Sequence, residues 1–218
     1  MGRNSGGSGG GGIYATSTAT NIAVTSNGKK LGPSKLKVVL QSAAPLDSLS
    51  HRDTVKELHR GISRFEAVMG VRERHIQVAD LDGAYGVTYL GRDGSQGIYL
   101  SRKAFDKSKS AVGQQYYKDN YATGFKNVTR APVQHTITHE LAHSTWTRFY
   151  DTPKHKAAGK EITELYKRWT KDHKKKGYGL YGASNVDEFW AEVITKAVHG
   201  KADRYTKRAV NIARRWKL

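Results

Sequence analysis

His139-Glu140-Leu141-Ala142-His143 is the stretch around which the rest of the chain is best interpreted. Its two histidines are four residues apart, so on a helix they lie one turn apart on the same face, and both imidazoles can reach one ion. Glu140 is displaced around the helix, where its carboxylate can face a water on that ion without binding the ion itself. Pro132 suits the first turn of a helix. We therefore predict a helix from Pro132 to about Phe149.

Two imidazoles and water make a weak site, so a third protein ligand is expected. The candidates elsewhere in the chain are His135, His173, Glu188, Glu192 and His199. Glu188 is favoured because it opens a largely apolar helix that Ser184 or Asn185 caps and that reaches about Val198. A buried carboxylate there is costly without a compensating cation. Glu192, one turn later, can accept a hydrogen bond from the free ring nitrogen of a ligand histidine.

These ligand types predict Zn²⁺ as the cofactor. Zinc binds neutral imidazole and carboxylate in a four-coordinate site and leaves one position open to water. The chain has no cysteine, which excludes thiolate ligands, disulfides and a cysteine nucleophile. No other cofactor-binding residues are predicted.

The motif and the later helix together resemble a known family. His139-Glu140-Leu141-Ala142-His143, with Tyr181, Glu188 and Glu192, is similar to the gluzincin arrangement of the anthrax-lethal-factor-like metallopeptidases and related bacterial toxin and phage-encoded zincin domains. In that family a tyrosine lies seven residues before the ligand glutamate, and an acidic residue lies four after it. Both spacings occur here. Ala142 stands where the family usually has glycine, which is a minor departure.

The resemblance implies a role for each matching residue. His139, His143 and Glu188 are the implied zinc ligands, and Glu140 is the implied general base. Tyr181 is the implied donor to the oxyanion, with Tyr178 as the competitor for that role, and Glu192 is the carboxylate behind the ligands. The expected activity is a zinc-dependent endopeptidase that hydrolyses protein or peptide substrates.

The predicted fold is α+β: a small zincin-like domain with a twisted, mainly antiparallel sheet. This sheet packs on an N-terminal helix over Asp53–Met69 and on the active-site helix. Strands are predicted over Lys37–Leu40, Arg74–Ala79, Ala84–Leu90 and Gly97–Ser101, with helices over residues 157–175 and 202–216. Residues 84–89 are expected to form an edge strand that holds an extended substrate.

Composition divides the chain into an arm and a domain. Residues 1–36 are rich in Gly, Ser and Thr and are predicted to be a flexible arm, with a transient strand near Ile22-Ala23-Val24. The domain is expected over residues 37–218. Within it, residues 37–150 form the sheet and active-site helix, and residues 151–218 form a basic helical subdomain that carries the third ligand.

The charge of the chain points to a second class of function. The net charge is +18, and residues 151–218 carry 17 Lys and Arg against 8 Asp and Glu. Such a surface is typical of contact with nucleic acid or another acidic polymer. The alternative prediction is therefore a basic nucleic-acid- or virion-associated binding protein in which the zinc site is structural or vestigial. Glu140 argues against a vestigial site, since a structural metal needs no base.

The sequence contains neither a membrane-spanning apolar run nor a signal-peptide pattern. A cytoplasmic location is the default expectation, with a virion-associated or signal-independent exported protein as the alternative. The oligomeric state is left open.

Overall fold

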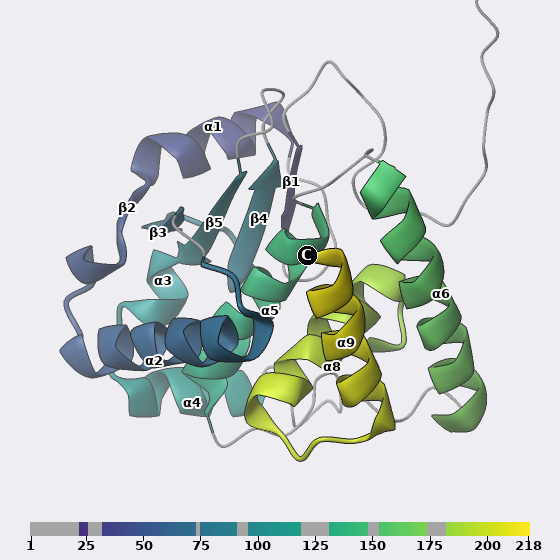
Figure 1. Cartoon of the computed structure of the whole chain (residues 1–218). Coiled ribbons are helices and arrows are strands. Elements are labelled where there is room, and N and C mark those ends of the chain that lie inside the picture. The colour runs from purple at the N-terminus through teal and green to yellow at the C-terminus, as the bar shows by residue number, and fades with distance from the viewer. Residues whose placement is uncertain are drawn as a thin grey trace, which may run out of the picture.

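The computed structural model describes residues 22–25, 32–72, 75–90, 96–118, 131–147, 153–173 and 182–218. Its strands are β1 (Ile22–Thr25), β2 (Ala44–Pro45), β3 (Ile76–Ala79), β4 (Gly86–Leu90) and β5 (Gln96–Ser101). Its helices are α1 (Pro33–Ser42), a 3₁₀ turn η1 (Leu46–Ser48), α2 (Arg52–Met69), α3 (Arg102–Phe105), α4 (Lys109–Tyr116), α5 (Pro132–Thr147), α6 (Pro153–His173), α8 (Val186–His199) and α9 (Arg204–Trp216). This content confirms the α+β class. Figure 1 shows the sheet on one side of α5 and the helices α6, α8 and α9 on the other.

The five strands form one mixed sheet in the order β1-β4-β5-β3-β2. β3 and β5 are parallel, and the other three pairs are antiparallel. Side chains alternate between the two faces. Ile98 and Leu100 of β5 belong to the main core, whereas Tyr99 and Val87 belong to a smaller core beneath α1. The sheet is therefore covered on both faces, by α1 on one and by α2 and α5 on the other.

The main core joins the sheet to the helices that carry the predicted ligands. Leu58 and Phe65 of α2 and Leu141 of α5 are buried in it, together with Trp169 of α6 and Trp190 of α8. Burial of this much aromatic and aliphatic surface fixes α5 and α8 against each other.

The segment around Lys37–Leu40 is a helix, so the strand predicted there is wrong. Pro33 occupies the first turn of α1, where its missing N–H costs nothing. Leu36 and Val39, three residues apart, are buried against the sheet, and Val38 is 52% exposed. This spacing of three is helical, whereas a strand would have buried alternate residues.

β4 is not an edge strand, which corrects a second expectation. The strand anticipated as transient at residues 22–25 pairs with it along its outer side, with Ile22 opposite Leu90 and Thr25 opposite Val87. β1 falls within the segment predicted as an arm and forms the edge of the sheet.

Most other predicted elements are confirmed within a few residues. The predicted helix at residues 53–69 is α2, and Gly70 ends it in a left-handed conformation with φ of 72°. Asn185, one of the two predicted caps, caps α8. None of the helices in the described ranges has the length and apolar character needed to cross a membrane.

Candidate metal centre

α5 and α8 bring together residues that are about 50 positions apart in the chain. The Asn185 side chain caps α8 by accepting hydrogen bonds from the backbone N–H groups of Asp187 and Glu188, at 3.0 and 2.9 Å. Across the interface, the Trp190 indole Nε1–H donates to Thr145 Oγ1 at 3.2 Å. These two contacts set the start of α8 and its register against α5, and so place Glu188 opposite the two motif histidines.

His139, His143 and Glu188 form a group that can hold a metal ion. The two Nε2 atoms are 3.1 Å apart. Glu188 Oε2 lies 3.2 Å from His139 Nε2 and 3.3 Å from His143 Nε2. All three side chains are buried, with exposures of 0% for His139, 4% for His143 and 1% for Glu188. Three donor atoms from two helices therefore converge on one point, as the sequence predicted.

Glu188 is held as a carboxylate. Burial acts to raise its pKa, but the imidazoles of His143 and His139 outweigh burial and lower the pKa of Glu188 to about 2. Neither of its oxygens accepts a hydrogen bond of ordinary geometry from a described residue. A buried carboxylate of this kind needs a cation. The donor set and its burial thus fit a bound metal ion.

Glu192 lies behind the imidazoles rather than among the converging atoms. Its Oε1 is 3.0 Å from His139 Nδ1, the ring nitrogen that faces away from Glu188, and 3.7 Å from His135 Nε2. Burial opposes ionisation, yet His135 and His139 hold the pKa of Glu192 well below its usual range. A carboxylate in this position favours the tautomer of His139 that carries its proton on Nδ1 and offers Nε2 to a metal.

Glu140 projects toward the sheet. It is 1% exposed, and its Oε2 lies 3.3 Å from the Thr88 hydroxyl of β4. Gly86 leaves room for it, since a Cβ on Gly86 would sit 2.6 Å from Glu140 Cγ. Neither Gly86 nor Thr88 was predicted as part of the site. The sequence indicates only that they lie two residues apart on one strand and therefore share a face.

The other histidine candidates have different surroundings. His199 Nε2 is 2.7 Å from the Thr138 hydroxyl, and burial is the main cause that lowers the pKa of His199 to about 4. His135 contacts Glu192 and the ring of Tyr116, whose centroid is 6.0 Å away. Neither belongs to the converging group. Tyr181 and its competitor Tyr178, and the side chain of His173, lie outside the described residues.

α6 supports the start of α8 through contacts that the sequence did not indicate. The Tyr166 hydroxyl donates to the Ala183 carbonyl at 2.9 Å, just before the cap. Phe189 packs against both Tyr166 and Trp169, with ring centroids 5.3 and 5.2 Å away. These contacts hold the turn that leads into Glu188.

No protein-family model matches the chain, and comparisons with curated proteins and with solved structures give no significant match.

Proposed function

We propose that the chain is a zinc-dependent endopeptidase of the gluzincin type. The observation that carries the proposal is the convergence of His139, His143 and Glu188, with donor atoms 3.1 to 3.3 Å apart. Donors on a tetrahedral zinc ion, at bond lengths of about 2.0–2.2 Å, are separated by about 3.3–3.6 Å, so the observed separations lie at or just below the short end of that range. The spacing and the ligand types both favour zinc.

The chemistry follows from the position of each group. Zinc, when bound, lowers the pKa of a water to about 7 and polarises the peptide carbonyl. Glu140 accepts a proton from the attacking water as the water oxygen bonds to the carbonyl carbon, and later delivers a proton to the amine nitrogen as the C–N bond breaks. A carboxylate and an amine result. Tyr181 is proposed, from the family resemblance, as the hydrogen-bond donor to the oxyanion.

Glu140 is well placed for this role in one respect: its carboxylate has a polar contact that orients it. The Thr88 hydroxyl approaches Oε2, and the backbone of Gly86 passes beside Cγ and Cδ. A base held by such neighbours loses little orientational freedom when it acts. Glu192 supports the ligand His139 in the same way.

Two substitutions test the metal and the base separately. Glu188→Ala should lose zinc, as measured by mass spectrometry of the purified protein. Glu140→Gln should keep zinc and abolish cleavage of a fluorogenic peptide library. Glu164→Gln is the matched control, because Glu164 is exposed on α6 and should keep both properties. Zinc-loaded protein that cleaves no peptide, or a Glu140→Gln variant that cleaves normally, would refute the proposal.

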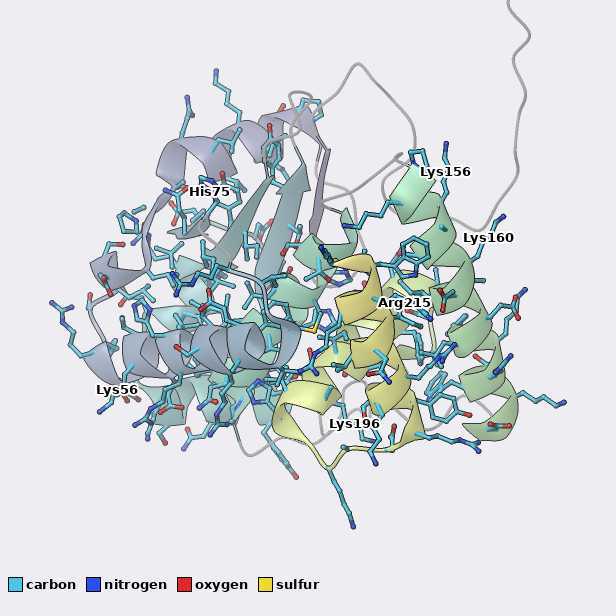
Figure 2. The ribbon with its side chains drawn as sticks, viewed as in Figure 1. Lys56, His75, Lys156, Lys160, Lys196 and Arg215 are labelled. Atoms are coloured by element: carbon cyan, nitrogen blue, oxygen red, sulfur yellow. The ribbon has the colours of Figure 1, made fainter. Side chains whose placement is uncertain are left out.

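A second candidate function is polyanion binding, and a groove between α6 and α9 favours it. The groove has a volume of about 780 Å³ and is lined in part by Lys160, Arg168, Lys171, Arg204 and Arg208. Outside the groove, Lys56 on α2 is exposed and points outward (Figure 2), whereas Lys196 on α8 pairs with Asp203 at 2.9 Å.

Two features of this groove weaken the second candidate. Glu161, Glu164 and Asp172 line the same groove, and Asp172 pairs with Arg204. In addition, two aromatic side chains near the groove that could stack on bases are buried: Trp169 is 0% exposed and Tyr205 is 3% exposed. Titration of double-stranded DNA at two salt concentrations tests it. Tight, salt-dependent binding that Glu140→Gln leaves unchanged, together with absent proteolysis, would favour it over the peptidase.

A further inference from the structure

The face of β4 that carries Gly86 and Thr88 lies beside the Glu140 carboxylate. Gly86 and Thr88, on one face of β4, both contact Glu140. β5 pairs with one edge of β4, so a further strand can pair directly with β4 only along its other edge. In the structure that edge is taken by β1, residues 22–25 of the same chain (Figure 1).

The orientation of β1 matches that of a peptide directed at the site. It runs antiparallel to β4, and Thr25, at its C-terminal end, pairs with Val87, the neighbour of Gly86. An extended peptide in the same place would therefore run from Leu90 toward Gly86, one of the two β4 residues that contact Glu140. Strand addition of this kind relies on backbone hydrogen bonds and tolerates many sequences.

The sequence of the occupying segment suits a reversible strand. Ile, Val and Thr favour the extended conformation, and no charged residue occurs between Arg3 and Lys29 in a chain that is 26% charged. The segment can thus lie along a sheet edge without desolvating a charge. A four-residue strand at a sheet edge forms few hydrogen bonds, which makes it a weak and displaceable partner.

We propose that residues 22–25 occupy the place where an extended peptide substrate pairs with β4, so that the chain's own N-terminal segment competes with substrate. This inference rests on the proposed peptidase function. It names the substrate class as unfolded or extended polypeptide that binds antiparallel to β4. It also makes access to the site depend on release of β1, which is tethered to α1 and is therefore present at high effective concentration.

The double variant Ala23→Pro/Val24→Pro tests the competition in the full chain. Proline removes a backbone N–H, and neighbouring residues direct theirs to opposite sides of the strand, so one of the two lies on the β4 side. The same double substitution at Ala15 and Thr16, ahead of the strand, is the control. We expect kcat/KM for an unstructured fluorogenic peptide to rise on the order of tenfold in the first variant only. An equal rate in all three proteins would overturn the inference.

A binding measurement does not require catalysis. In zinc-loaded Glu140→Gln protein, a labelled peptide of residues 18–28 should bind at least about tenfold more tightly after Ala23→Pro/Val24→Pro. If the proline variant binds the peptide more tightly but no protein with an intact Glu140 hydrolyses it, the peptidase proposal is refuted. The edge of β4 would then be a peptide-binding surface only. Hydrolysis by the catalytically intact protein, together with equal peptide binding by the two Glu140→Gln proteins, would support the peptidase and refute competition by β1.

Hydrogen exchange keeps the inference testable if the proline variant does not fold. In Glu140→Gln protein with the native strand, saturating peptide should displace β1. Exchange at the amides of residues 22–25 should then accelerate, while the amides of residues 87–90 stay protected. Unchanged exchange at residues 22–25 under saturating peptide would overturn the competition.

Discussion

Gly86→Ala tests whether the position of the Glu140 carboxylate matters for activity. A Cβ at residue 86 would lie 2.6 Å from Glu140 Cγ, 2.7 Å from Cδ and 2.8 Å from Oε1, whereas ordinary van der Waals contact begins at 3.4 Å. The carboxylate must therefore retreat by about 0.8 Å. The displaced atoms are the far end of a flexible side chain, so the fold can absorb the change by moving the proposed base.

The expected effects on rate and stability differ in size. Overpacking that a side chain can relieve costs about 1 kcal/mol of folding free energy, the low end of the usual range. A misplacement of about 1 Å in a catalytic group can lower the rate about 100-fold, which corresponds to about 2.7 kcal/mol in the activation barrier. We therefore expect kcat to fall about 100-fold while most of the stability remains.

The assay compares three proteins: native, Gly86→Ala and Gly113→Ala. A Cβ on Gly113 would meet only Pro132 Cγ at 3.5 Å, so alanine is expected to be tolerated there. Cleavage of a fluorogenic peptide, zinc content and the urea midpoint are measured for each. Native activity in Gly86→Ala would refute the reasoning. A loss of activity that only tracks a loss of folded protein would also refute it, because it would reflect packing and not the position of Glu140.

Three further changes address the surroundings of the metal centre. Glu192→Gln removes the charged acceptor behind His139 and should weaken zinc binding about 10- to 100-fold in a chelator competition, and unchanged affinity would contradict the supporting role. Burial lowers the pKa of His199 from its ordinary value of 6.5 to about 4, so the unfolded chain takes up a proton there at higher pH than the folded one. Stability should therefore fall as the pH drops from 6.5 to 4. The loss is on the order of 2 kcal/mol for this partly buried side chain, and urea unfolding of His199→Gln should show a flatter pH dependence. Thr145→Val removes the acceptor of the Trp190 indole N–H and should cost about 1–2 kcal/mol by urea unfolding, with zinc content as the check that α8 keeps its place.

The sequence predicted the features that depend on local chemistry. Asn185 caps α8 because this role needs only a side-chain acceptor within a few residues of the helix start. The helical spacing of His139 and His143 is local as well. Glu188 is distant in the chain, but the cost of burying a carboxylate in an apolar helix made it the favoured partner.

The features that the sequence did not predict depend on partners far away in the chain. The apolar run at Lys37–Leu40 is short enough to suit a strand or a helix. Pro33 at the first turn and the packing of this segment against the sheet favour the helix. The pairing of β1 with β4 leaves no side-chain pattern, because it is made by backbone groups. The contact of Gly86 and Thr88 with Glu140 requires the packing of α5 on the sheet.

The distribution of acidic residues gives a final test of what neutralises the metal centre. Among the described residues, every buried acidic side chain lies on α5 or α8: Glu140, Asp187, Glu188 and Glu192. Either protonated imidazoles or a divalent cation can compensate this charge. Imidazolium is lost as the pH rises, whereas a metal requires neutral imidazoles and binds more tightly toward neutral pH.

The two possibilities predict opposite pH trends in the stabilisation that zinc provides. If the cation is the compensating charge, the difference in Tm between zinc-loaded and EDTA-treated protein should grow from pH 5 to pH 7.5. Thermal unfolding monitored by circular dichroism at matched pH values measures it, with the zinc-deficient Glu188→Ala variant as the control that should show no difference. A difference that is absent at pH 7.5 would mean that the buried carboxylates are compensated by protons, and the peptidase proposal would lose its chemical basis.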